Sequence, residues 1–168
     1  MSKVEAALTA LQMAIQTEID GHNFYQRFAE RSTDPDAQRI FDRLARDEIM
    51  HLELLRSTRA MLEESGEWAE YKGLVLEAVP AAPIFSQERV QQNIVAYTSD
   101  LSALRVAYLI EKDAVDFYTR AAAQTDDANG RRMFKDLAAM EQGHLRLLEG
   151  EYNSLMSSFQ NAMGFSPF

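Results

Sequence analysis

The two halves of the chain repeat each other. Positions 11–55 align with positions 104–148 at a shift of 93 residues, without a gap, and eighteen of the aligned pairs are identical. Shared helical composition alone gives only a few such matches. The repeat therefore predicts two similar helix hairpins related by a pseudo-two-fold axis.

Each half is expected to contain two long helices. Apolar residues recur at i, i+3, i+4 and i+7, and only four prolines and seven glycines interrupt the chain. We predict helices at about 3–31, 36–64 and 87–124, and a fourth that runs from the Thr125-Asp126-Asp127 turn to about Ser158. Asp34 before Pro35, and Ser86, are the expected N-caps of the second and third helices.

The predicted fold class is all-α, a four-helix bundle in a single domain that covers residues 1–168. The turns near 33 and 126 are short, so residues 3–64 and 87–158 should form two antiparallel hairpins. Residues 65–86 lack clear periodicity and are too long for an ordinary loop, which favours a crossover between the hairpins. The tail, 159–168, is apolar and is expected to pack on the bundle or on another chain.

Charge and composition exclude several classes of function. The net charge of −9 disfavours nucleic acid and anionic membranes, and the only basic run is Arg131-Arg132. With no cysteine, the chain cannot form disulfides, thiolate zinc sites, iron–sulfur clusters or a cysteine nucleophile. No segment resembles a signal peptide or a membrane span, because even the weakly polar stretch 73–85 carries Glu77 and two prolines. We therefore expect a cytoplasmic protein.

The repeat also conserves residues that can bind metal. Glu48-Ile-Met-His51 recurs as Glu141-Gln-Gly-His144, and residues three apart lie on one face of a helix. Both pairs fall in apolar stripes, as do two further glutamates of the first and third predicted helices. Four carboxylates and two imidazoles should thus meet in the bundle core: Glu18, Glu48, His51, Glu111, Glu141 and His144.

Such a cluster needs compensating charge. Ionised carboxylates in an apolar interior cost several kcal/mol each, and four together repel one another. Two divalent cations would supply four positive charges, and imidazole with carboxylate suits transition metals. One Glu from each of two helices and Glu-x-x-His from each of the other two form the di-iron or di-manganese arrangement of carboxylate-bridged bundles.

On these residues the chain resembles the ferritin-like superfamily and, within it, rubrerythrin-type diiron proteins. The resemblance covers residues 3–158 and implies two iron ions, with Mn or Zn as substitutes, bridged by Glu48 and Glu141 and held terminally by Glu18 and Glu111. It implies oxidation of Fe(II), or reduction of hydrogen peroxide or dioxygen, in defence against oxidative stress. Glu48 and Glu141 would then be catalytic as well as metal-binding, and the protein is expected to form a homodimer or higher homo-oligomer.

The chain departs from rubrerythrins in two respects. It has no cysteine for a rubredoxin iron, so electrons would come from Fe(II) or from an unidentified external donor. Ala114 occupies the position where peroxidase members tend to carry an additional glutamate. A ferroxidase or an oxygen-scavenging role therefore stays open beside the peroxidase role. Iron binding or storage without peroxidase turnover is the alternative function, and a bundle that merely holds zinc or manganese is a third.

Residues next to the predicted ligands suggest a supporting layer. Tyr25 and Tyr118 lie two turns beyond Glu18 and Glu111, and each phenol is expected to hydrogen-bond a ligand carboxylate across the site; both are also candidates for catalytic electron relay. Asp47 is expected to accept from the non-ligating nitrogen of His144, with Met140 at the matching position of the other half.

Other polar residues near the site are less persuasive candidates. Asp20 and Asp113 are matched in the repeat and are alternatives to Asp47. His22 is expected to have a structural role, because its repeat partner is Val115.

Overall fold

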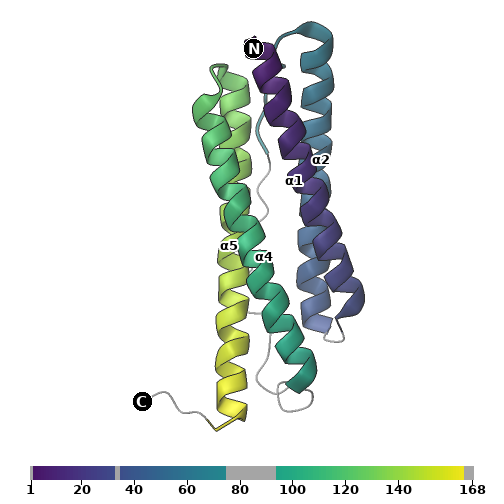
Figure 1. Cartoon of the computed structure of the whole chain (residues 1–168), viewed down its shortest axis with the longest axis vertical. Helices are drawn as coiled ribbons and strands as arrows, with labels where there is room; N and C mark the ends of the chain where they lie inside the picture. The colour runs from purple at the N-terminus through teal and green to yellow at the C-terminus, as the bar shows by residue number, and fades with distance from the viewer. Residues whose placement is uncertain (1, 33–34, 75–93, 165–168) are drawn as a thin grey trace.

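In a computed structural model the chain forms four long helices (Figure 1). The structure describes residues 2–32, 35–74 and 94–164. The helices are α1 (Lys3–Arg31), α2 (Pro35–Ser65), α4 (Ile94–Gln124) and α5 (Ala128–Ala162). The described residues contain no strand, which confirms the predicted all-α class. None of the described helices is both long and apolar enough to cross a membrane.

The helices pack as two hairpins. α1 packs along α2, α4 packs along α5, and α1 meets α4 where the hairpins face each other. α2 ends at the end of the bundle that carries the N-terminus, whereas α4 begins at the opposite end (Figure 1). A long segment is therefore needed between these two helices, while short turns suffice within each hairpin.

Local sequence sets several of the helix ends. Ser2 and Glu5 form a capping box at the start of α1, where the Ser2 hydroxyl accepts from the Glu5 amide at 3.1 Å. Asp127 caps α5 by accepting from the amides of Asn129 and Gly130. α2 ends at Gly66, whose φ of 71° favours glycine. The predicted caps Asp34 and Ser86, and the predicted start of the third helix near 87, lie outside the described residues.

α5 is longer than the sequence analysis predicts. It continues to Ala162, past the expected end near Ser158, because its apolar stripe continues. Leu155 is fully buried, and Phe159 packs against the same core cluster. Part of the expected tail is therefore the last turn of this helix. Met163, which follows it, is 49% exposed.

The core repeats its aromatic packing in both halves. Tyr25 stacks on Phe41 with ring centroids 6.3 Å apart, and Tyr118 stacks on Phe134 at 6.2 Å. All four rings are fully buried. These two stacks belong to separate apolar clusters. The identical residues of the repeat thus occupy equivalent places in the fold.

The first residues after α2 pack against the start of α5. The Trp68 ring lies edge-on to Phe134 at 6.1 Å. The Tyr71 amide donates to the Asn129 side chain at 3.2 Å. A Cβ atom added to Gly130 would lie 2.7 Å from the Trp68 ring, closer than real Cβ contacts. Glycine at 130 therefore allows the indole to lie directly on the helix backbone.

We expect Gly130→Ala to destabilise the protein. The added methyl group forces Trp68 out of its place, and overpacking of this kind costs about 1–3 kcal/mol. Gly150→Ala, in the same helix, is the matched control, because a Cβ there meets nothing within 4 Å. That change should stabilise by about 0.5–1 kcal/mol through helix propensity. Urea unfolding of both variants measures the difference, and equal effects would contradict the proposed packing.

Candidate metal centre

The six side chains predicted to bind metal meet in the centre of the bundle. Glu18 comes from α1 and Glu111 from α4, while α2 and α5 each contribute a glutamate and a histidine. None of the six is more than 5% exposed. The helical period explains this, since each Glu-x-x-His pair spans one turn of a buried stripe. The site is thus built from rigid helices and from both hairpins.

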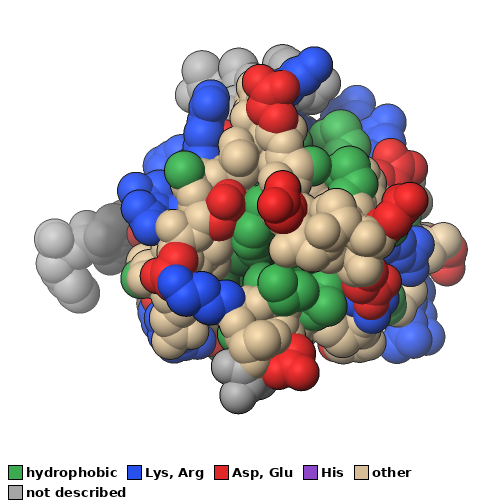
Figure 2. All heavy atoms as spheres, turned by 90° about the horizontal axis from the view of Figure 1, so that it is seen from above, with side chains coloured by type: hydrophobic (Ala, Val, Ile, Leu, Met, Phe, Trp, Pro, Cys, Tyr) green, Lys and Arg blue, Asp and Glu red, His purple; other side chains and the backbone are tan. Residues whose placement is uncertain are grey.

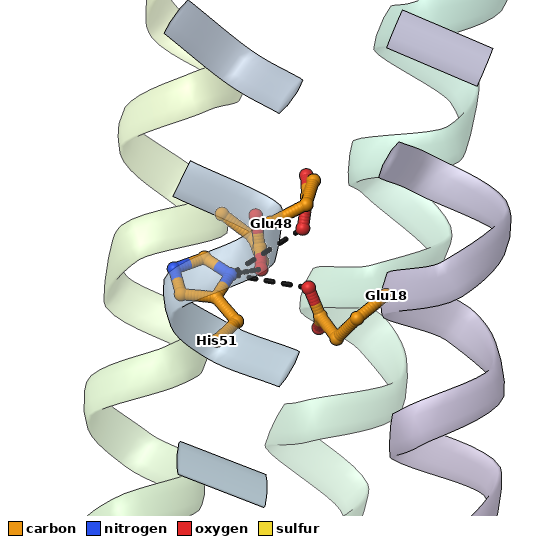
Figure 3. A group of neighbouring side chains, drawn as sticks. Glu18, Glu48 and His51 are labelled. Carbon is orange, nitrogen blue, oxygen red and sulfur yellow. Dashed lines mark hydrogen bonds and ion pairs between the residues drawn. The ribbon is translucent and has the colours of Figure 1, made fainter. Parts of the chain in front are cut away.

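The ligand atoms fall into two overlapping groups. Glu18, Glu48, His51 and Glu141 form one, and Glu48, Glu111, Glu141 and His144 form the other, with atoms in each group within 4.8 Å of one another. Figure 3 shows part of the first group, in which Glu18 of α1 and Glu48, one turn before His51 on α2, both point toward His51. Glu48 and Glu141 are common to both groups. The arrangement has one carboxylate and one imidazole on each side of a shared carboxylate pair.

Each imidazole faces three carboxylates through its Nδ1 atom. His51 Nδ1 lies 3.2 Å from Glu18, 3.4 Å from Glu48 and 3.0 Å from Glu141. His144 Nδ1 lies 2.8 Å from Glu141, 3.4 Å from Glu111 and 3.9 Å from Glu48.

These spacings suit a metal ion. Ligand atoms roughly 2.0–2.2 Å from a metal in tetrahedral geometry lie about 3.3–3.6 Å from one another. The observed distances are close to that range, at 3.0–3.4 Å around His51 and 2.8–3.9 Å around His144.

The hydrogen bonding within the cluster is incomplete. Both carboxylate oxygens of Glu141 and the Nδ1 atom of His144 are buried and make no well-directed hydrogen bond among the described residues, although the histidine nitrogens lie within 3.0 Å of this carboxylate. Buried polar atoms are nearly always paired, because leaving one unpaired costs about 1–3 kcal/mol. These atoms belong to the groups that face each other at ligand-like distances. A cation between them would satisfy all three, so the residues present fit a metal pair.

Protons compensate part of the negative charge when no cation is bound. Burial, reinforced by the charges of Glu18 and Glu141, raises the pKa of Glu48 well above its usual range. Burial and the Glu141 charge raise the pKa of Glu111 to about 8. Both carboxyl groups therefore keep their protons to higher pH than an ordinary glutamate does. Proton binding is thus favoured at Glu48, which belongs to both ligand groups, and at Glu111, which belongs to one.

Glu141 behaves in the opposite way. Its burial opposes ionisation, but the positive charges of His51 and His144 hold its pKa well below the usual carboxyl value. Burial likewise opposes the charged form of both histidines, yet the surrounding carboxylates raise the pKa of each well above its ordinary value. Without metal, Glu141 is therefore the carboxyl group that ionises most readily, and both imidazoles beside it hold their protons more tightly than a free histidine does.

Metal binding should release protons and strengthen as the pH rises. Ligands bind metal in their deprotonated forms, and Glu48, Glu111, His51 and His144 all carry raised pKa values. Each displaced proton changes the apparent affinity about tenfold per pH unit. We therefore expect affinity to increase by more than tenfold from pH 6 to pH 7. Titration calorimetry in buffers of different ionisation enthalpy counts the protons, and a pH-independent affinity would contradict this.

Two tyrosines connect the hairpins through the terminal carboxylates. The Tyr25 hydroxyl donates to Glu111, and the Tyr118 hydroxyl donates to Glu18. Both expected hydrogen bonds across the site are thus present. Burial, with the adjoining carboxylate charges, raises the pKa of each phenol well above its usual value. Each tyrosine therefore remains a proton donor that fixes one terminal carboxylate.

The Asp47 contact is present, and its alternatives are wrong. Asp47 Oδ2 lies 3.2 Å from His144 Nε2. Asp20 and Asp113 are exposed on the outer faces of α1 and α4 and do not reach the cluster. The His22 Nδ1 atom lies 2.9 Å from the carbonyl of Ala45 and takes no part in the metal groups, as expected.

The metal groups do not open onto the hollow at the end of the bundle. That hollow, about 600 Å³, is lined by Val4, Ala7, Leu62, Trp68, Asp126 and other residues, none of them from the metal groups. Figure 2 looks onto this end and shows apolar side chains at the centre with acidic side chains around them. The metal groups lie deeper, between the helices. A buried centre of this kind admits small molecules and ions rather than large substrates.

Comparison with known proteins agrees with the geometry of the cluster. A family model described as Rubrerythrin matches residues 9–152. This range includes all six clustered side chains and both tyrosines. No curated protein and no solved structure matches the chain significantly.

Proposed function

Because the chain belongs to the rubrerythrin family, we propose that its buried cluster holds two iron ions and that the protein is a diiron oxidoreductase. It would oxidise Fe(II), or reduce hydrogen peroxide or dioxygen. The observation that carries the proposal is the overlap of two four-residue ligand groups through Glu48 and Glu141. Shared carboxylates hold two ions close enough to react with one small molecule.

Some residues of the centre would bind the metal ions, and others would supply protons. When bound, iron would supply the electrons that reduce a small oxidant. Glu48 and Glu141 would help to hold both ions, with Glu18 and His51 completing one position and Glu111 and His144 the other. Burial excludes bulk water from the centre and strengthens electrostatic interactions there. The Tyr25 and Tyr118 hydroxyl groups hold protons next to the terminal carboxylates, where reduction of an oxidant consumes them.

Anaerobic loading with Fe(II) tests the proposal. The full chain should bind two Fe(II) ions, and optical spectra recorded in a stopped-flow instrument should show oxidation within seconds of adding peroxide or air. Faster oxidation by peroxide than by air would favour the peroxidase role. Continued uptake of iron well beyond two ions per chain would favour storage. Failure to bind iron would refute the proposal.

The tyrosines should affect the rate more than the binding of metal. Tyr118→Phe removes the hydrogen bond to Glu18 but keeps the ring stacked on Phe134. We expect two ions still to bind, with oxidation slowed about tenfold or more, in the range typical of lost proton-transfer groups. Tyr152→Phe is the control, because Tyr152 is partly buried at the edge of the core, away from the cluster. Equal rates in all three proteins would exclude a role for the phenol.

A further inference from the structure

The two halves of the centre differ in the support given to their histidines. His144 Nε2, the nitrogen that faces away from the cluster, lies 3.2 Å from Asp47 Oδ2. The corresponding nitrogen of His51 is buried and has no hydrogen-bond partner among the described residues. The repeat explains the difference, because Met140 occupies the position that matches Asp47. A thioether cannot replace the carboxylate as a strong acceptor.

Asp47 is itself held in place. It is 8% exposed, lies on α2 directly before Glu48, and has the Arg43 Nε atom 3.9 Å from its Oδ2 atom. Its carboxylate reaches across to α5, so it fixes a histidine of the other hairpin. An accepting carboxylate keeps the proton on Nε2, which leaves Nδ1 free for metal and fixes the orientation of the ring. The Nε2 atom of His51 has no comparable acceptor among the described residues.

We propose that the two metal positions are unequal, with the position of His144 and Glu111 binding its ion about 10- to 100-fold more tightly than that of His51 and Glu18. The inference rests on the proposed dimetal function and deepens it. Asp47 is a positioning residue, since it acts through His144 and does not touch the metal. One ion is then resident, and the other is the first to leave on dilution or chelation.

Repulsion between two bound cations also makes the second ion bind more weakly than the first. The test must therefore identify which position binds the first ion, as well as the ratio of the two dissociation constants. The repeat allows the residues at the two matching positions, Asp47 and Met140, to be exchanged. The variants are Asp47→Met, Met140→Asp and the double variant. Co(II) is a suitable probe, because it accepts imidazole and carboxylate ligands. Competition with a chelating indicator gives both dissociation constants. Anomalous scattering from crystals of the full chain grown with one equivalent of Co(II) locates the first ion.

In the unmodified protein the first Co(II) should occupy the His144 position. Asp47→Met should weaken the tighter constant about tenfold or more. Met140→Asp should strengthen the weaker constant, and it keeps the inference testable if Asp47→Met fails to fold by circular dichroism. In the double variant the first ion should move to the His51 position.

Three results would overturn the inference. These are a first ion at the His51 position of the unmodified protein, equal occupancy of both positions, and constants that Asp47→Met leaves unchanged. Each leaves the proposed dimetal function intact as long as two ions bind. Absence of any Co(II) binding would overturn both.

Discussion

Glu141→Gln and Glu48→Gln should each abolish the binding of two metal ions. Both residues belong to both ligand groups, so either change removes a ligand from both positions at once. Glutamine keeps the size of the side chain but not its charge. We expect affinity at both positions to fall more than about 100-fold, beyond the 10- to 100-fold typical of residues that only support a ligand. Metal content after gel filtration, measured by elemental analysis, gives the result directly.

Glu18→Gln is the matched control for this experiment. Glu18 belongs to only one of the two groups, so its loss should weaken one ion and spare the other. Circular dichroism should show intact helices in all three variants. If Glu48→Gln and Glu141→Gln both retained two ions, the shared-carboxylate arrangement would be wrong.

The same two variants should differ in stability when no metal is bound. The charges of the two histidines hold the pKa of Glu141 well below its usual value, whereas burial raises the pKa of Glu48 well above its usual value. Glu141→Gln removes the nearest carboxylate from both rings, and breaking a buried ion pair in this way costs about 3–5 kcal/mol. Glutamine is a close substitute for a neutral carboxylic acid, so Glu48→Gln should change stability by about 1 kcal/mol or less. Urea unfolding of both variants in excess chelator measures the difference between their free energies of unfolding.

The repeat is why so much of the site could be predicted from the sequence. Identity between the halves reduces six candidate ligands to two copies of one pattern, and the helical period then places each copy on a buried face. Tyr25 and Tyr118 could be predicted for the same reason, since a side chain two turns along a stripe must face the opposite hairpin. The Asp47 contact can be predicted from its position beside Glu48, although the sequence also offers Asp20 and Asp113, which unlike Asp47 are matched in the repeat.

What the sequence could not predict depends on distances between helices. Glu48 and Glu141 are equivalent in the repeat, yet only Glu141 lies within 3.0 Å of both imidazoles. That proximity decides which carboxylate stays ionised. The contact of Trp68 with Gly130 joins residues outside the repeated pattern. The extra turn of α5 depends on whether Phe159 finds apolar neighbours, which periodicity alone does not determine.

Removing metal should lower the melting temperature, and by more at high pH. Two sites that each hold free metal at 100 times its dissociation constant add about 5 kcal/mol to the free energy of unfolding. For a chain of this size that corresponds to a shift of about 10–20 °C. Scanning calorimetry of metal-loaded protein and of chelator-treated protein, at pH 6 and at pH 8, measures the shift and its pH dependence.

The sign of the pH dependence follows from the direction of each pKa shift. Glu48, Glu111 and both histidines bind protons more tightly in the folded, metal-free state than when unfolded. Their contribution to metal-free stability is therefore lost as the pH rises through the folded pKa values, about 8 for Glu111. Glu141 acts oppositely, but its contribution is lost only as the pH falls below the ordinary carboxyl range.

Metal replaces those protons, so the loaded protein avoids the loss while its affinity for metal increases with pH. The difference in melting temperature should consequently widen from pH 6 to pH 8. Glu48→Gln provides the control. Because this variant should lose metal binding at both positions, added metal should barely change its melting temperature. A melting temperature unchanged by chelation, or a difference that narrows with rising pH, would mean that the buried carboxylates are neutralised by something other than bound cations.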